Sequence, residues 1–193
     1  VFQATDANVM DFLLRERQDE CFVQFLTSGE EASMQLETGR FRYLFVLQAF
    51  TKIYAVPGIR LGYGISSDKA LLERMETVRQ PWSVSTPAQA AGLSALKEDH
   101  REEQTRQLVK SERERMEKEL ENLRIEYIPS EANFLLFNSE INWFEELKKR
   151  GILIRDCANY RGLGNGWYRL AVRLPEENDR LLECMKQVLN ERS

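Results

Sequence analysis

The sequence has few of the residues from which disulfide frameworks, metal sites and histidine catalysis are built. Its 193 residues include three cysteines, Cys21, Cys157 and Cys184, which are too few and too widely spread for a disulfide framework or a metal site. We expect them to be small, buried, apolar side chains. The single histidine, His100, lies among charged residues, which argues against histidine catalysis and a histidine-bound metal.

Long apolar runs and blocks of a single charge are also missing. Lysine and arginine total 27 against 31 acidic residues, and no basic block suggests a nucleic-acid partner. No apolar run approaches the length that crosses a bilayer, and no signal-peptide pattern is found. We therefore expect a cytoplasmic protein that binds neither membrane nor nucleic acid, with one domain or two.

The most informative stretch covers residues 50–63, FTKIYAVPGIRLGY, with Lys52 and Arg60 eight residues apart around a Pro-Gly turn. A lysine that is desolvated near a second cation has a lowered pKa, and its amine can then attack an aldehyde. The planar guanidinium of arginine suits a phosphate dianion. Together these two residue types describe a pocket for pyridoxal 5′-phosphate (PLP). The alternative is a pair of solvated cations on a surface loop.

The order of this stretch resembles the cofactor-lysine segment of the class I/II aminotransferases, a family of fold-type I PLP enzymes. The family pattern is Ser/Ala-x-Ser/Thr-Lys, a linker, Gly-x-Arg and Leu/Ile-Gly-Tyr; here it is AFTK at 49–52 and GIRLGY at 58–63. The resemblance implies that Lys52 is the catalytic lysine that binds the cofactor aldehyde and that Arg60 binds the cofactor phosphate. Thr51 is expected to offer a hydroxyl, whereas Ala49 replaces a serine that often adds a further phosphate hydrogen bond.

Asp19, 33 residues before Lys52, is the candidate partner of the cofactor's pyridine nitrogen. The segment DECF at residues 19–22 resembles the Asp-Glu-x-Tyr/Phe strand end of this family. The resemblance implies an ion pair between Asp19 and the protonated ring nitrogen, which keeps the ring an electron sink. Phe22 lacks the hydroxyl that relatives often place there. The alternative for Asp19 is a solvated carboxylate at the end of a helix over residues 6–17.

Arg155 and Arg169 are candidate substrate-binding residues, each inside an apolar, strand-like run. Burying an arginine in such a run is costly unless an anion meets it, so two arginines predict a dianionic or doubly acidic ligand. By the family resemblance Arg169 binds the substrate α-carboxylate. Arg155 binds a substrate phosphate, as in histidinol-phosphate aminotransferases and threonine-phosphate decarboxylases. The alternative is ordinary salt bridges with acidic neighbours, which is the favoured interpretation for Arg173.

The runs ILIRDCANY at 152–160 and YRLAVR at 168–173 resemble the decarboxylases of cobalamin synthesis more than the transaminases. The resemblance implies PLP-dependent decarboxylation of L-threonine O-3-phosphate to aminopropanol phosphate, a small phosphorylated amino acid as substrate, and a homodimer. Lys52 then serves as general base or acid. A histidinol-phosphate-type aminotransferase stays open, as does an inactive remnant that acts only as a folded or dimerising module.

The same resemblance implies an α/β fold of the PLP-dependent transferase type (fold type I), of which this sequence contains about half. Residues 1–95 are expected to be part of the large PLP-binding domain. Residues 96–193 are expected to form the small α+β carboxyl-terminal domain with its long connecting helix. The family's Gly-rich phosphate loop, stacking aromatic and Asn-Pro turn are expected in a preceding portion, so we interpret the chain as a carboxyl-terminal fragment or a truncated gene product.

Hydrophobic periodicity and turn residues predict the individual elements. Helices are predicted over residues 6–17, 67–80, 86–123 with a break near Asp99, 141–150 and 176–190. Strands are predicted near residues 21–25, 43–47, 61–65, 124–128 and 133–137, in a run that ends at Arg155, and around Arg169.

Overall fold

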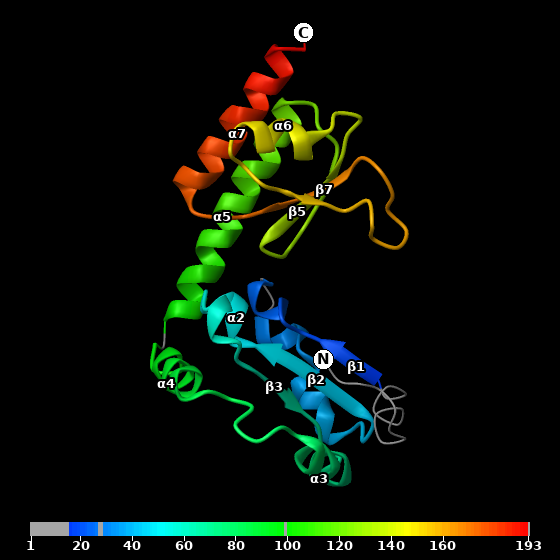
Figure 1. Cartoon of the computed structure of the whole chain (residues 1–193), viewed down its shortest axis with the longest axis vertical. Coiled ribbons are helices and arrows are strands. Elements are labelled where there is room, and N and C mark those ends of the chain that lie inside the picture. The colour runs from blue at the N-terminus through cyan, green and yellow to red at the C-terminus, as the bar shows by residue number, and fades with distance from the viewer. Residues whose placement is uncertain (1–15, 27–28, 99, 193) are drawn as a thin grey trace. The chain divides into compact units, whose positions relative to one another are not determined.

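The protein was analysed as a computed structural model that describes residues 16–26, 29–98 and 100–192. The chain divides into two compact units, residues 1–103 and residues 104–193, and each is described by itself (Figure 1). The helix predicted over residues 6–17 falls largely outside the described residues. Its last two positions are wrong, because Glu16 and Arg17 begin a β-strand.

The first unit is built on a three-stranded sheet in the order β1-β2-β3. The central strand β2 pairs in parallel with β1 and antiparallel with β3. Its side chains Leu44, Phe45 and Val46 are buried, which makes β2 the core of this unit. The strands are β1 (Glu16–Asp19), β2 (Leu44–Ala49) and β3 (Gly62–Ile65).

The strand predicted over residues 21–25 is wrong, because the chain leaves the sheet at Asp19. The Asp19 carboxylate accepts the Cys21 backbone N–H at 3.1 Å, and the Val23 N–H donates to the Glu20 carbonyl at 3.1 Å, so the backbone turns at once. Three short 3-10 helices fill the connection to β2, at Val23–Phe25, Gly29–Ala32 and Met34–Gly39.

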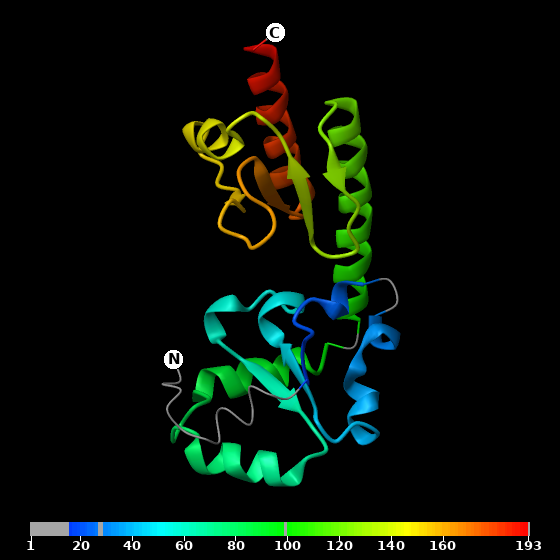
Figure 2. The ribbon, with the colours of Figure 1, turned by 90° about the vertical axis from the view of Figure 1, so that its right-hand side faces the viewer.

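The helices of the first unit agree with the sequence patterns. Asp68 caps α3 by accepting the Leu71 N–H at 3.1 Å, and Ser85 caps α4 by accepting the Ala88 N–H at 3.3 Å. The predicted break near residue 99 is confirmed, since α4 ends at Ala95 and α5 begins at Arg101 (Figure 2). The helical elements are α2 (Phe50–Ile53), the 3-10 turn η4 (Pro57–Ile59), α3 (Lys69–Val78) and α4 (Thr86–Ala95).

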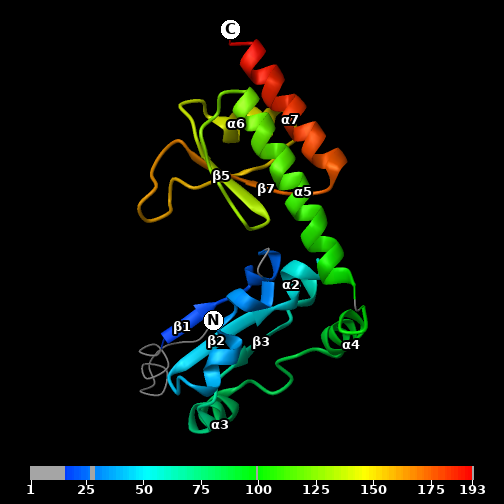
Figure 3. The same ribbon diagram turned by 180° about the vertical axis from the view of Figure 1, so that it is seen from behind.

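The second unit is an antiparallel sheet in the order β4-β5-β7-β6, with α5 and α7 side by side along one face (Figure 3). Alternate residues of β5 and β7 are buried on that face, as are Met116 of α5 and Met185 of α7. The elements are α5 (Arg101–Asn122), β4 (Tyr127–Ile128), β5 (Phe134–Asn138), α6 (Trp143–Lys149), β6 (Arg155–Asp156), β7 (Trp167–Ala171) and α7 (Pro175–Asn190).

Two strands of this unit are shorter than predicted. The strand expected to end at Arg155 instead begins there and has two residues, because β6 is an edge strand that pairs only with β7. The strand expected from residue 124 begins at Tyr127, because Arg124 has a left-handed φ of 57° and completes the turn that ends α5. Within the described part of the chain, no helix is long and apolar enough to cross a bilayer.

Candidate active site

Lys52 follows the central strand of the first unit on the four-residue helix α2. The side chain is exposed, and its Nζ lies 5.3 Å from the centroid of the Phe22 ring. β1 and β2 run in parallel with Asp19 opposite Leu47, so their carboxyl ends meet at one edge of the sheet. The topology therefore brings Lys52 and the segment after Asp19 together, although they are 33 residues apart.

Asp19 ends β1 and is held as a carboxylate by its neighbour Cys21. Hydrogen bonds from the Cys21 side chain, and then from its backbone N–H, lower the pKa of Asp19 below its usual value. Burial, and then the Asp19 carboxylate, raise the pKa of the Cys21 thiol to about 11, while the Lys52 charge opposes the shift. Asp19, Cys21 and Lys52 are thus one electrostatically coupled cluster. Cys21 is half-buried rather than buried, as is Cys184, whereas Cys157 is buried as expected.

Arg60 lies just before β3, in the left-handed region with a φ of 57°. The Phe50 N–H donates to the Leu61 carbonyl at 3.2 Å, and Ala49 pairs with Gly62, so the residues beside Arg60 return to the start of α2. The exposed guanidinium donates to the Pro57 carbonyl at 3.3 Å, and no carboxylate of the described residues forms an ion pair with it. Arg60 is therefore available to an anion. Thr51 is half-buried on the same short helix as Lys52.

A buried polar network that the sequence analysis did not identify fixes this edge of the sheet. The Glu20 carboxylate accepts hydrogen bonds from Ser33 Oγ at 2.5 Å, the Met34 N–H at 2.7 Å and Gln48 Nε2 at 3.2 Å. Tyr63 Oη donates to Gln48 Oε1 at 2.7 Å. The network joins the end of β1 to β2 and β3, since Glu20 directly follows Asp19, Gln48 lies on β2 and Tyr63 lies on β3. A polar Gln48 inside the apolar run of β2 is the signal that points to it.

An aromatic cluster holds the other side of α2. The Phe50 ring stacks on Tyr54 at 5.2 Å between centroids and meets Tyr63 edge-on at 5.9 Å. The Tyr54 hydroxyl donates to the Glu102 carboxylate, and burial together with this hydrogen bond raises the pKa of Tyr54. These contacts fix both ends of the turn that presents Lys52.

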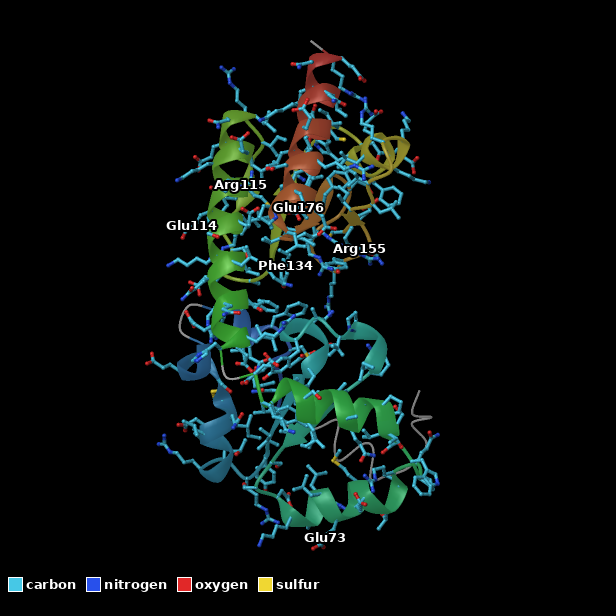
Figure 4. The ribbon with its side chains drawn as sticks, turned by 90° about the vertical axis from the view of Figure 1, so that its left-hand side faces the viewer. Glu73, Glu114, Arg115, Phe134, Arg155 and Glu176 are labelled. Carbon is cyan, nitrogen blue, oxygen red and sulfur yellow. The ribbon has the colours of Figure 1, made fainter. Side chains whose placement is uncertain are left out.

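Arg155 and Arg169 are cross-strand partners in the second unit, and Arg169 alternates along β7 with the buried Tyr168 and Leu170, so both arginines lie on the sheet face opposite the core. The Arg169 guanidinium lies 5.1 Å from the Phe134 ring centroid, and the Arg155 guanidinium lies 5.3 Å from that of Tyr160. Figure 4 shows Phe134 and Arg155 near the same end of this unit. Among the described residues no acidic side chain is ion-paired with either arginine, whereas Arg173 pairs with Glu177 at 2.8 Å. The salt-bridge interpretation thus fits Arg173 alone.

The positive charges of Arg155 and Arg169 both influence the pKa of the buried Cys157 thiol. Burial raises the pKa of Cys157, and the charges of Arg169 and then Arg155 oppose that shift. Both guanidiniums therefore act on the same point at the β6–β7 edge. Two cations on adjacent strands, without a carboxylate between them, are the residue types that suit a dianion, and their role in binding one stays a prediction.

The residue types of the first unit fit a PLP cofactor. Lys52 provides an exposed amine, Asp19 an ionised carboxylate for a protonated ring nitrogen, and Arg60 a guanidinium without an acidic partner. The individual roles of these residues, and of Arg155 and Arg169, stay predictions. Within the described residues, no group of three His, Cys, Asp or Glu side chains is placed to hold a metal ion.

Comparison with known proteins gives one consistent result. Residues 18–184 match the family model described as aminotransferase class I and II. The threonine-phosphate decarboxylase of Salmonella typhimurium is 37% identical over 175 residues, which cover 89% of this chain and 48% of that protein. Histidinol-phosphate aminotransferase 1 of Archaeoglobus fulgidus is 35% identical over 192 residues, covering 96% and 57%.

The solved structure of the histidinol-phosphate aminotransferase from Clostridium acetobutylicum superposes with a TM-score of 0.85 and 31% identity, over 91% of this chain and 54% of that one. The chain thus spans about half the length of the relatives it matches. The predicted fold is confirmed as part of the fold-type I architecture of PLP-dependent enzymes. On the strength of its sequence and its fold, the chain belongs to the class I and II aminotransferase family.

Proposed function

We propose that the first unit binds PLP. In this proposal Lys52 bonds to the cofactor aldehyde, Asp19 pairs with the pyridine nitrogen, and Arg60 binds the phosphate with help from the Thr51 hydroxyl. The observation that supports it best is the cluster of Asp19, Cys21 and Lys52 at the carboxyl ends of β1 and β2. Family membership supports it independently, since the family is PLP-dependent.

We further propose that the reaction is decarboxylation of L-threonine O-3-phosphate to aminopropanol phosphate. This substrate has a phosphate and a carboxylate, which match the two arginines of the second unit, Arg155 for the phosphate and Arg169 for the carboxylate. The 37% identity to a threonine-phosphate decarboxylase supports this choice of substrate.

The chemistry follows from a few groups. PLP, when bound, supplies an electron sink that accepts the electron pair of the bond broken at the substrate α-carbon. The ionised Asp19 keeps a proton on the ring nitrogen. Arg155 and Arg169 orient the substrate so that its carboxylate, rather than its α-hydrogen, is the group lost. Lys52 would act as the general acid there, because its amine would hold the proton that the α-carbon gains once CO2 has left.

A histidinol-phosphate-type aminotransferase is the second candidate. The 31% identity and TM-score of 0.85 with such an enzyme favour it, as does the 35% identity to the Archaeoglobus protein. It uses the same residues with a different orientation of the substrate. There Lys52 takes the α-hydrogen as a proton, and a 2-oxo product results.

The products distinguish the candidates. The chain is incubated with PLP and O-phospho-L-threonine, and both released CO2 and aminopropanol phosphate are measured; a parallel reaction with histidinol phosphate and 2-oxoglutarate measures glutamate. CO2 release that depends on Lys52 supports the decarboxylase, and glutamate formation without CO2 supports the aminotransferase. Bound cofactor with neither product contradicts both activities and favours a folded module without catalysis.

A further inference from the structure

Asn159 is the side-chain hydrogen-bond partner of Arg155, whereas Arg115, Arg150 and Arg173 of this unit pair with carboxylates. Arg155 Nη2 donates to Asn159 Oδ1 at 3.0 Å, and the two residues are four positions apart. Arg173 has a partner at the same spacing of four residues, but there the partner is the Glu177 carboxylate, at 2.8 Å. One arginine is thus neutralised by a carboxylate, and the other is held by a neutral amide.

The turn after β6 fixes Asn159 in place. The Asp156 carboxylate accepts the Ala158 N–H at 2.8 Å, and the Tyr160 N–H donates to the Cys157 carbonyl at 2.9 Å. The Tyr160 ring then lies against the Arg155 guanidinium, 5.3 Å from its centroid. Arg155 is therefore held by one hydrogen bond and one aromatic ring, and neither removes its charge.

Asp156 is the acidic residue nearest to Arg155 in the sequence, but its side chain lies on the opposite face of the sheet. It is the cross-strand partner of Tyr168, whereas Arg155 is the partner of Arg169, and side chains of adjacent strand residues point to opposite faces. The Asp156 charge also acts on the buried Tyr168, whose pKa is raised mainly by burial and then by this carboxylate. Asp156 is thus directed away from the two guanidiniums.

We propose that Asn159 is a specificity-determining residue, because its amide positions Arg155 without giving that guanidinium an internal anionic partner, so that the charge of Arg155 serves the dianionic group of the substrate. This inference rests on the proposed binding of a phosphorylated amino acid by Arg155 and Arg169. A carboxylate at position 159 would form an internal ion pair with Arg155 and compete with the phosphate. The choice of asparagine therefore selects for a doubly charged ligand over a neutral one.

The test is Asn159→Asp, which changes the charge and almost nothing in shape. Inorganic phosphate is titrated into the full chain while the backbone amide signals of β6 and β7 are followed by NMR. Asn159→Asp should weaken phosphate binding at these signals by about tenfold or more, the range expected for a hydrogen bond to a charged group. Without phosphate, the variant should melt at a higher temperature than wild type, because it gains an ion pair.

Asn165→Asp is the matched control, since Asn165 is exposed in the same β6–β7 connection and adds the same charge. It should change the phosphate affinity by less than about twofold, as expected for a screened surface charge. Asn159→Ala, which removes the hydrogen bond but adds no charge, should weaken binding by less than Asn159→Asp does.

Three results would overturn the proposal. The first is unchanged phosphate binding in Asn159→Asp, the second is equal weakening in Asn165→Asp, and the third is a wild-type chain whose β6 and β7 signals do not respond to phosphate. Turnover of O-phospho-L-threonine is measured separately. Phosphate binding that depends on Asn159 without turnover contradicts the decarboxylase function and leaves the role of Asn159 supported.

Discussion

Arg155 and Arg169 are cross-strand partners on β6 and β7, with two positive charges on one face of the sheet. Side chains directly opposite each other on adjacent strands have Cβ atoms about 5 Å apart, and like charges at that separation destabilise the pairing. Aromatic rings and an amide, rather than carboxylates, lie against these guanidiniums. The protein therefore retains a repulsion between these two cations that an anion bound beside them would reduce.

This repulsion predicts that O-phospho-L-threonine stabilises the chain through Arg155. At a ligand concentration ten times the Kd, the unfolding free energy should rise by about 1.4 kcal/mol. Arg155→Gln should lose most of this gain, whereas Arg161→Gln, an exposed arginine in the same connection, should keep it. Thermal unfolding with and without ligand at matched ionic strength provides the measurement. An equal gain in Arg155→Gln would contradict the assignment.

The Cys21 thiol should be slow to react with alkylating agents. With a pKa of about 11, the thiolate fraction at pH 9 is roughly fiftyfold below that of a thiol with a pKa of 9. Asp19→Asn should speed the reaction by removing a charge that raises the pKa, and Glu31→Gln should not. The thiol contributes to stability below pH 9, and this contribution is lost as the pH rises from 9 to 11.

Peptide-level mass spectrometry of alkylated samples taken across this pH range separates Cys21 from the other two cysteines. A half-point near pH 9 for Cys21 in the wild-type chain would show that its thiol is neither desolvated nor coupled to Asp19.

Asn178 should be important for the stability of the second unit. It is 1% exposed; its amide donates to Glu112 Oε2 at 2.7 Å and to the Arg173 carbonyl at 2.9 Å, and it accepts the Arg173 N–H at 3.0 Å. Asn178→Ala leaves these groups without a partner and should lower the unfolding free energy by about 2 kcal/mol. Asn190→Ala, at the exposed end of α7, serves as the control in urea unfolding and should change it by less than about 0.5 kcal/mol.

Gly64 should not tolerate a side chain. A Cβ at this position would lie 2.2 Å from Cζ of the buried Phe45 ring, so Gly64→Ala forces the core of the first unit to shift. We expect a loss of about 1–3 kcal/mol in unfolding free energy. The same change at Gly39, where a Cβ meets nothing within 4 Å, should be nearly neutral. Equal stability of the two variants would show that β3 is not packed on Phe45.

Local sequence patterns predicted the helices well, because helix caps and hydrophobic periodicity depend on residues that are close in the sequence. The helices predicted from residues 67, 86 and 176 begin within two residues of those positions, after the caps Asp68 and Ser85 and at Pro175. The family, too, was evident from the order of residues around Lys52 and Arg60, since that order matches a family motif rather than a periodicity.

The predictions of strand position were wrong where the structure depends on pairing between strands that are far apart in the sequence. Residues 21–25 are apolar enough for a strand, but β1 is set by its parallel register with β2 and ends at Asp19. The length of β6 depends on β7 alone, which no local pattern reveals. The network around Glu20 was missed for the same reason, since Gln48 meets it from 28 residues away.

The Lys52 amine is the proposed point of attachment of the PLP aldehyde, and it can be identified directly. The full chain is incubated with a slight excess of PLP, reduced with borohydride to make the bond permanent, digested, and mapped by mass spectrometry. The label is expected on Lys52, and Asp19→Asn should lower its yield while Glu31→Gln should not. A label spread over exposed lysines such as Lys69 and Lys118, with no preference for Lys52, would contradict it.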